Sequence, residues 1–322
     1  KEVVDDVISP ATEISLDAAQ KISPHAQLGD LVNVDIRTQA FGRIAAQTAK
    51  QVIIQGIREA ERGMVFDAFV SKEHEILSAT VLRIEPNSGD MIVRIGGGQD
   101  RTDAMLAASE QVRGEHYKEG DIIRVYVVEV RRSTRGPQVI VSRTHPGLVK
   151  RLFELEVPEI ADGLVEIKSI AREAGSRTKL AVCATEENID PVGACVGTRG
   201  ARVGAVVDEL HGEKMDIVIW SEDPCKFVAS ALSPSDVVSV TVLPGAVKAC
   251  RVVVPDDQLS LAIGKEGQNA RLAARLTGYK IDIKSASQAA ELPDPVEEAE
   301  AAMAAEAAAD AEPDAPEASA ED

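Results

Sequence analysis

An internal duplication in the second half of the chain constrains its fold more than any other sequence feature. From residue 145 the pattern predicts a helix, two strands, a short helix, a glycine turn, a longer helix and a strand, and from residue 223 the same order returns. Gly197 and Gly264, which open the two turns, are 67 residues apart. The sequence therefore predicts two tandem αββααβ domains, a first repeat at 145–222 and a second repeat at 223–290.

Each repeat has a Gly-x-x-Gly turn between its short helix and its longer helix. Glycine lets a sugar-phosphate approach the main chain without meeting a Cβ atom, and the amides that open the next helix favour a phosphate. KH domains clamp about four single-stranded nucleotides in this way. One such turn is weak evidence, since any turn between helices can hold two glycines. Two at the same place in the same order of elements are strong evidence.

We therefore predict an RNA contact at both turns. Val196 and Ile263, the apolar residues before the turns, would form the floor of a groove for unstacked bases. The other residues expected there are Gly197, Thr198, Arg199, Gly200 and Arg202 in the first repeat, and Gly264, Lys265, Glu266, Gly267, Gln268, Asn269 and Arg271 in the second.

Residues 74–144 are rich in short strands, and their size and turn spacing predict a small β-barrel of the oligonucleotide-binding type. The strand-like stretches are EILSATVLRIEP, GDMIVRIGG, GDIIRVYVVEVRRS and PQVIVSRT. Several cations near the end of this segment indicate a basic edge that contacts RNA. A solvated basic hairpin and a purely structural barrel are the alternatives. The cations of this edge are Arg131, Arg132, Arg135 and Arg143.

The pattern of residues 1–73 predicts part of an N-terminal α/β domain, called the head below. Strand-like phrases occupy residues 3–8 and 31–36, and three- and four-residue apolar spacing predicts one long amphipathic helix over about residues 38–70. We interpret this helix as a connector or docking helix that sets the distance between the head and the RNA-binding domains. An ordinary helix packed on the preceding strands fits the pattern equally well.

The net charge of −18 at first argues against a nucleic-acid partner. However, residues 285–322 hold 12 acidic residues and no Lys or Arg, so the rest of the chain carries 41 acidic against 35 basic residues, a net charge of −6. An RNA-binding surface must then be a local patch. Residues 291–322 lack aromatic residues and are expected to form a disordered acidic tail.

Other classes of function find little support. The four cysteines form no CxxC pair and are expected to be isolated buried thiols, so we predict neither a disulfide framework nor a metal site. The pattern of a P-loop is absent. Gly96 and Gly98 match the first two glycines of the dinucleotide loop Gly-x-Gly-x-x-Gly, but the third glycine of that pattern is missing. No catalytic arrangement or cofactor site emerges. Without a signal segment or an apolar stretch long enough for a membrane, a cytoplasmic protein is expected.

Four stretches closely resemble the bacterial NusA family, and the resemblance extends over nearly all of residues 1–290. They are FGRIAAQTAKQVIIQGIREAER, VSRTHPGLVKRLFELEVPEIADGLVEIKSIAREAGSRTKLAV, DPVGACVGTRGARVGAVVDELHGEKMDIVIW and LAIGKEGQNARLAARLTG. The resemblance implies a multidomain α+β protein. Its domains would be an N-terminal head that docks on RNA polymerase (1–73, with its start missing), an S1 barrel of OB type (74–144) and two type II KH domains (145–222 and 223–290).

The resemblance also implies a non-catalytic transcription factor that acts at the RNA exit channel in pausing, intrinsic termination and antitermination. The expected partners are nascent single-stranded RNA, the RNA polymerase core and other Nus antitermination factors, with the protein itself a monomer. Few aromatic residues are present in the S1 segment (Tyr117 and Tyr126), so we expect the barrel to contribute charge more than base stacking. The alternative is a general S1/KH RNA-binding or RNA-processing protein, associated with an exoribonuclease, that never meets polymerase.

Overall fold

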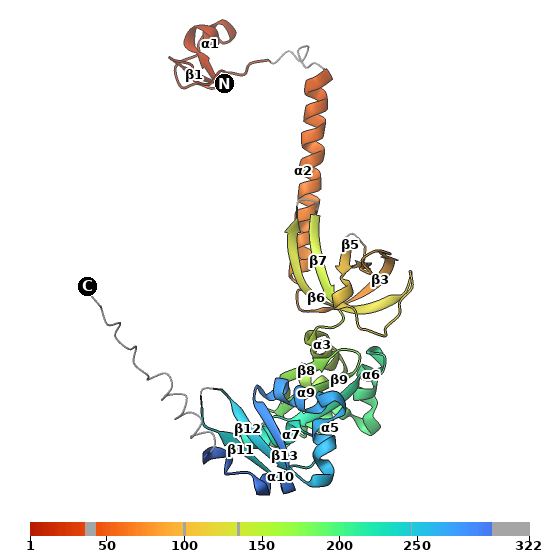
Figure 1. The fold of residues 1–322 in the computed structure, drawn as a ribbon. Coiled ribbons are helices and arrows are strands. Elements are labelled where there is room, and N and C mark those ends of the chain that lie inside the picture. Colours follow the sequence, from red (N-terminus) through yellow and green to blue (C-terminus); the bar gives the residue numbers. More distant parts are fainter. Residues whose placement is uncertain (36–42, 99–100, 134–135, 246, 298–322) are drawn as a thin grey trace, which may run out of the picture. The chain divides into compact units, whose positions relative to one another are not determined.

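The computed structural model describes residues 1–35, 43–98, 101–133, 136–245 and 247–297 (Figure 1). The chain forms two compact parts, Lys1–Glu61 and Arg62–Asp322. Four sequence predictions lie wholly or partly outside the described residues: Arg135, the last residue of the strand at 31–36, the first residues of the long helix, and the acidic tail from residue 298 onward.

The N-terminal part contains a small α/β arrangement. β1 (Glu2–Val4) pairs in parallel with β2 (Glu13–Ser15), and α1 (Leu16–Ile22) follows directly. The predicted strand at 31–36 is wrong over its described residues. Leu31 makes only an isolated bridge to Glu2 and is 83% exposed, because this segment touches the small core through Val32 alone.

The predicted long helix is α2 (Arg43–Val70), whose 28 residues extend over about 42 Å. Its last turns belong to the second part of the chain. There Phe69 is buried in the core of the barrel, and Val65 and Phe66 pack against that core. Helical spacing brings these residues to one face, which is the face that docks on the barrel.

The barrel has five strands and is closed in the order β3-β4-β5-β7-β6. The strands are β3 (Ile76–Ile84), β4 (Met91–Ile95), β5 (Thr102–Leu106), β6 (Ile122–Ser133) and β7 (Gly136–Ser142). The stretches predicted from the sequence did not include β5. This strand closes the barrel by pairing antiparallel with β4 and in parallel with β7.

The two repeats have the same sheet topology and, apart from the short helix α4 of the first repeat, the same order of elements. The first repeat consists of α3 (Pro146–Glu156), α4 (Pro158–Ala161), β8 (Val165–Glu173), β9 (Arg177–Ala184), α5 (Pro191–Val196), α6 (Ala201–Glu209) and β10 (Lys214–Ile219). The second consists of α7 (Pro224–Ala231), β11 (Ser239–Leu243), β12 (Ala249–Val254), α8 (Leu259–Ile263), α9 (Gln268–Thr277) and β13 (Lys280–Ser285), after which α10 (Ala286–Glu291) follows. In each sheet the central strand pairs antiparallel with one neighbour and in parallel with the other.

In the repeats, the start of a helix is marked in the sequence by a capping residue followed by proline. His145, Asp190 and Asp223 each accept a hydrogen bond from a backbone amide two residues later, at the starts of α3, α5 and α7. Proline follows at the first helical position, where its missing N–H costs nothing. These local signals explain why the helix starts of both repeats were predictable.

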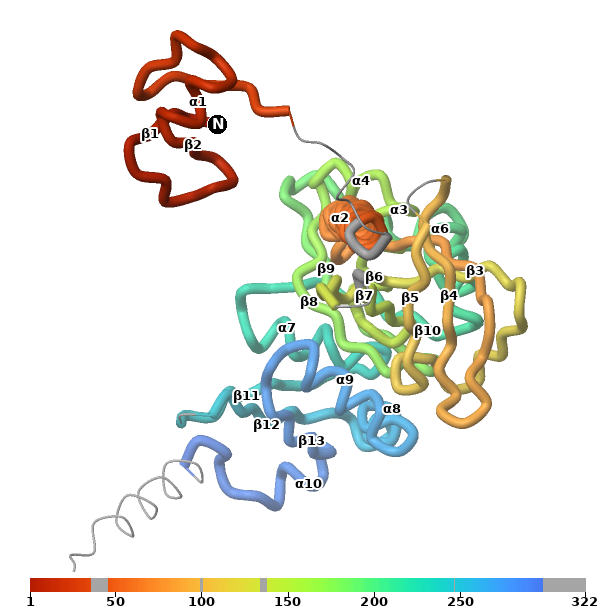
Figure 2. Tube along the Cα trace, turned by 90° about the horizontal axis from the view of Figure 1, so that it is seen from above, coloured from red at the N-terminus to blue at the C-terminus, as the bar shows by residue number. Residues whose placement is uncertain are grey.

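The two repeats share one hydrophobic core and lie side by side (Figure 2). Helices α7 and α9 of the second repeat contact their own sheet and also the sheet of the first repeat. Ala171, Ala181 and Val218 of the first repeat are therefore buried together with residues of the second. Lys179, which is fully buried, adds a hydrogen bond of 2.7 Å from its Nζ to the Ser233 carbonyl oxygen. The repeats thus form one packed body.

Within the described residues, no helix is both long and apolar enough to span a membrane. The four cysteines are free thiols, of which Cys195 and Cys250 are buried while Cys183 and Cys225 are partly exposed. Burial raises the pKa of both Cys195 and Cys250 to about 11, so these two thiols are poor nucleophiles.

Candidate nucleic-acid interface

The two Gly-x-x-Gly turns have nearly identical backbone conformations. Gly197 has φ 72° and ψ 176°, and Gly264 has φ 76° and ψ 172°, a region open essentially to glycine alone. The third residue of each turn is left-handed although it carries a side chain, with φ 54° at Arg199 and 53° at Glu266. The same backbone shape is thus presented twice, independently of the residues between the glycines.

The first glycine of each turn packs tightly on the helix that follows. A Cβ atom at Gly197 would lie 2.7 Å from the Arg202 Cγ, and one at Gly264 would lie 2.9 Å from both the backbone nitrogen and the Cβ of Asn269. Any other residue would push the turn away from its helix. The glycines therefore determine how closely the turn approaches the first amides of α6 and α9.

The exposed surface of each turn is formed by its two central residues. Thr198 and Arg199 in the first turn, and Lys265 and Glu266 in the second, are exposed. Among the described residues, no side chain caps the start of α6 or α9. The first amide of each helix instead donates within the turn, from Ala201 to the Thr198 carbonyl oxygen and from Gln268 to the Lys265 carbonyl oxygen. Positive helix ends next to exposed polar residues suit a phosphate group.

The apolar residues before the turns are accessible. Ile263 is 38% exposed and Val196 is half-buried. Leu261, two residues before Ile263 in α8, is 45% exposed. Exposed aliphatic side chains beside a phosphate-binding turn offer a surface for the flat face of a base.

Other predicted contact residues already have partners within the protein. Arg202 donates to a Glu159 carboxylate oxygen at 2.8 Å and to the Ala194 carbonyl oxygen at 2.6 Å. Asn269 is buried, and its Nδ2 donates to the carbonyl oxygens of Leu232 and Ala262 at 3.0 Å each, so this side chain joins α9 to the preceding helices.

Gln268 and Arg271 are both bound to Glu173, a residue of the first repeat. The Gln268 Nε2 donates to a Glu173 carboxylate oxygen at 2.9 Å, and the Arg271 Nε donates to the other at 2.6 Å. Nothing in the local pattern around Glu173 marked it as a neighbour of the second turn, which is more than 90 residues away in the chain.

The predicted basic edge of the barrel is only partly present. Arg131 is exposed and pairs with Glu129 at 2.6 Å. Arg132 is exposed, with its guanidinium 4.4 Å from the centre of the Phe66 ring, a cation–π contact with α2. Arg135 lies outside the described residues.

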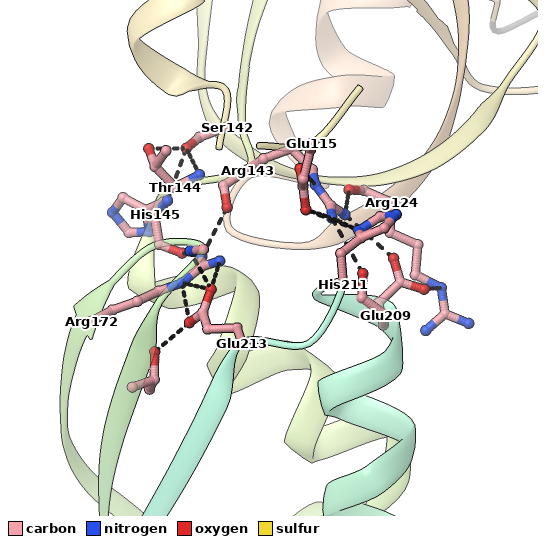
Figure 3. Close-up of polar contacts among 12 residues, drawn as sticks. Glu115, Arg124, Ser142, Arg143, Thr144, His145, Arg172, Glu209, His211 and Glu213 are labelled. Carbon is pink, nitrogen blue, oxygen red and sulfur yellow. Dashed lines mark hydrogen bonds and ion pairs between the residues drawn. The ribbon is translucent and has the colours of Figure 1, made fainter. Parts of the chain in front are cut away.

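Arg143 does not belong to an exposed edge, and this part of the prediction is wrong. Its side chain is only 1% exposed and lies between the barrel and the first repeat (Figure 3). The guanidinium donates to both carboxylate oxygens of Glu115, at 2.5 and 3.1 Å, and to the Arg124 carbonyl oxygen at 2.9 Å. It also reaches Glu209 at the end of α6 at 3.3 Å. A buried cation with this set of acceptors serves as a structural anchor between two domains.

The Arg143 pocket keeps its acidic partner ionised. Burial alone would raise the pKa of Glu115, but hydrogen bonds and charge from Arg143 outweigh it, and the net pKa lies below the ordinary value of 4.5. Tyr117 donates to the same carboxylate at 2.7 Å. Burial raises the pKa of this phenol, which therefore stays protonated as a donor.

A second buried arginine completes the junction from the side of the first repeat (Figure 3). Arg172 donates to both carboxylate oxygens of Glu213, and its Nη1 donates to the carbonyl oxygens of Arg143 and His145 at 2.8 and 3.0 Å. Arg172 therefore holds the backbone of the segment whose Arg143 side chain is held by the barrel. The barrel and the first repeat are joined through a short linker that is fixed on both sides.

Within the described ranges, no group of three or more His, Cys, Asp or Glu side chains could hold a metal ion. The features described above as accessible are the two turns, their apolar flanks and the exposed Arg131 and Arg132 of the barrel. These features are suited to a polyanion with exposed bases.

Family models match four consecutive segments of the chain. They are a NusA N-terminal domain at residues 1–63, an S1 RNA binding domain at 71–142, a NusA-like first KH domain at 143–220 and a NusA-like second KH domain at 224–291.

Full-length relatives agree with these matches. The chain is 54% identical to the transcription termination/antitermination protein NusA of Halalkalibacterium halodurans, over 91% of this chain and 75% of that protein. It is 54% identical to the same protein of Bacillus subtilis, over 91% of this chain and 77% of the relative. For the protein of Thermus thermophilus the identity is 44%, over 89% of this chain and 72% of the relative.

Proposed function

Because the chain belongs to the NusA family of transcription termination/antitermination proteins, we propose that it grips nascent single-stranded RNA with both Gly-x-x-Gly turns while bound to RNA polymerase. In this role it modulates pausing, intrinsic termination and antitermination without catalysing a reaction.

The observation that carries the RNA-binding part of the proposal is the repetition of one turn geometry. Two turns of the same conformation, each at the start of a helix without a side-chain cap among the described residues, belong to repeats that share a core. A single KH turn clamps about four nucleotides. Two turns on one body would bind a longer strand with the combined strength of both sites.

The proposal assigns different roles to the predicted residues. Arg199 and Lys265 would approach phosphates, and Val196 and Ile263 would contact bases. The exposed arginines of the barrel would add charge, which increases affinity without selecting a sequence. Arg143, being buried, has no part in RNA contact.

The remaining partners follow from the family. The N-terminal domain would dock a monomer on the RNA polymerase core in the cytoplasm, together with other Nus factors. A general RNA-binding protein would not copurify with polymerase, so copurification of the full-length protein with polymerase core supports the proposal over that alternative. An RNA-processing enzyme would release nucleotides from RNA in the presence of phosphate, and such release would contradict a non-catalytic role.

The direct test measures the affinity of a labelled single-stranded RNA by fluorescence anisotropy at several salt concentrations. One variant replaces the exposed central residues of both turns with aspartate. A control variant makes the same four replacements at exposed positions of the N-terminal part. The turn variant changes Thr198, Arg199, Lys265 and Glu266, and the control changes Thr12, Arg58, Lys50 and Glu59.

We expect the turn variant to bind at least about tenfold more weakly, since one charge-assisted hydrogen bond contributes ~1.5 kcal/mol. The slope of log affinity against log salt should also become shallower, by about 0.7 for each phosphate that is no longer bound. The control should bind like the wild type. Equal binding by a folded turn variant would show that the turns are not the RNA site.

A further inference from the structure

Glu173 is the last residue of β8 in the first repeat, and it binds three side chains of α9 in the second. The Arg271 Nε and Nη2 donate to its two carboxylate oxygens at 2.6 and 3.2 Å. The Gln268 Nε2 donates at 2.9 Å, and the Arg275 Nη1 lies 3.8 Å from the carboxylate. One carboxylate therefore contacts side chains from the first two turns of α9.

The same contacts continue into the second Gly-x-x-Gly turn. The Arg271 Nη1 donates to the Glu266 carbonyl oxygen at 3.1 Å. Glu266 is the left-handed residue of that turn, with φ 53°. Since a guanidinium is planar, bonds to both Glu173 and Glu266 hold this carbonyl in one orientation relative to the first repeat. Gln268 adds a bond of 2.8 Å to the Ser176 Oγ, in the connection between β8 and β9.

These polar contacts lie at the rim of the shared core. Beneath them, α9 packs on β8 and β9, with Leu272 and Ala273 buried near Ala171 and Ala181. The Glu173 side chain is 21% exposed, and Arg271 is 45% exposed. A partly exposed ion pair contributes little to folding stability. The apolar packing holds the repeats together, whereas the polar contacts orient the turn.

We propose that Glu173 is a positioning residue that holds the second Gly-x-x-Gly turn in register with the first, so that one RNA strand reaches both turns. This inference rests on the proposed function. Glu173 itself does not touch RNA, because a carboxylate repels phosphate. Arg271 acts mainly through Glu173 and Glu266, rather than as the phosphate contact that its place in the sequence suggested.

The test compares two single-stranded RNAs, one of about five nucleotides, enough for one turn, and one of about twelve, enough for both. The variant is Glu173→Gln in the full chain. The matched control is Glu166→Gln on the same strand, where Glu166 is 55% exposed and pairs with Lys168 instead of with the second repeat. Circular dichroism and thermal melting verify that both variants fold.

We expect Glu173→Gln to weaken binding of the long RNA about tenfold, a fraction of the 10² to 10⁴ that linking two sites commonly supplies. Binding of the short RNA should stay within about twofold of the wild type, since each turn remains intact. Glu173→Asp keeps the charge but shortens the side chain, so it should weaken binding by an intermediate amount. This second variant also serves if Glu173→Gln does not fold.

A double-mutant cycle distinguishes positioning from direct contact. If Arg271 works through Glu173, then Glu173→Gln combined with Arg271→Gln binds the long RNA no more weakly than Arg271→Gln alone. Additive losses of affinity, or a ratio of long to short affinity in Glu173→Gln equal to that of the wild type, would overturn the positioning role and leave the proposed function standing. Failure of the wild type to bind either RNA would overturn the proposed function and this inference with it.

Discussion

At the scale of single residues, Arg143 and Arg131 show how differently two nearby arginines can act. Arg143 is enclosed by Glu115, Glu209 and backbone carbonyls, whereas Arg131 is exposed beside Glu129. Removing one partner of a buried ion pair leaves the other charged and desolvated, at a cost of about 3 to 5 kcal/mol. We therefore expect Arg143→Ala to lower the free energy of unfolding by about this amount.

Urea denaturation followed by circular dichroism measures this decrease, with Arg131→Ala as the control. The control should unfold at the wild-type urea concentration, because its ion pair is screened by water. The effects on RNA affinity should be the opposite of those on stability. Folded Arg143→Ala should bind RNA about as tightly as the wild type, whereas Arg131→Ala should bind it more weakly. A small effect of Arg143→Ala on stability would contradict its role as an anchor.

At the scale of elements, the conformation of the turn before α9 depends on Gly264, which packs closely against the first residues of that helix. At Gly264 the backbone adopts a conformation that costs other residues about 1 to 3 kcal/mol. A Cβ there would also meet Asn269. We expect Gly264→Ala to destabilise the fold by about this amount and to weaken RNA binding, as measured by thermal melting and anisotropy.

Gly204 provides the matched control for this element. It lies inside α6, and a Cβ there would meet nothing within 4 Å. Alanine in a helix interior is favoured over glycine by about 0.5 to 1 kcal/mol, so Gly204→Ala should raise the melting temperature. If Gly264→Ala and Gly204→Ala changed the melting temperature in the same direction, the special role of Gly264 would be disproved.

At the scale of the whole molecule, both junctions between the RNA-binding domains depend on ionised carboxylates. The pKa of Glu173 is lowered by its hydrogen bond with Arg271. Burial would raise the pKa of Glu115 and of Asp216, but Arg143 in the first case and Arg177 with Lys179 in the second lower it below the ordinary value. Each group binds protons more weakly in the folded chain than in the unfolded chain.

Stability should therefore fall in acid. The contribution of these carboxylates is complete above their ordinary pKa values of 4.5 and 3.8, and it disappears as the pH falls through the lower values of the folded state. Trp220, the single tryptophan, packs against the shared core and reports unfolding by its fluorescence. We expect a lower urea midpoint at about pH 3 than at about pH 7, and a smaller difference in Arg143→Ala. An unchanged midpoint would contradict this linkage.

The sequence by itself determined the order of helices and strands in the two repeats, the repetition itself and the position of both turns. Proline after His145, Asp190 and Asp223 marks helix starts, and the spacing of Gly197 and Gly264 marks the duplication, because helix capping and backbone conformation depend on neighbouring residues. β5 was missed because TDAML is short, and because the pairing that closes the barrel joins it to β7, a strand that comes later in the chain than β6.

Only the tertiary structure decided which charged residues face solvent and which hold domains together. Arg143 meets Glu115 and Glu209, and Glu173 meets Arg271, across separations of 28, 66 and 98 residues. Local pattern treats every arginine near a turn or strand end as a surface cation. Whether it is one depends on the burial and acidic partners that distant segments bring to it, because the energy of a charge is determined by its surroundings in space rather than by its neighbours in the chain.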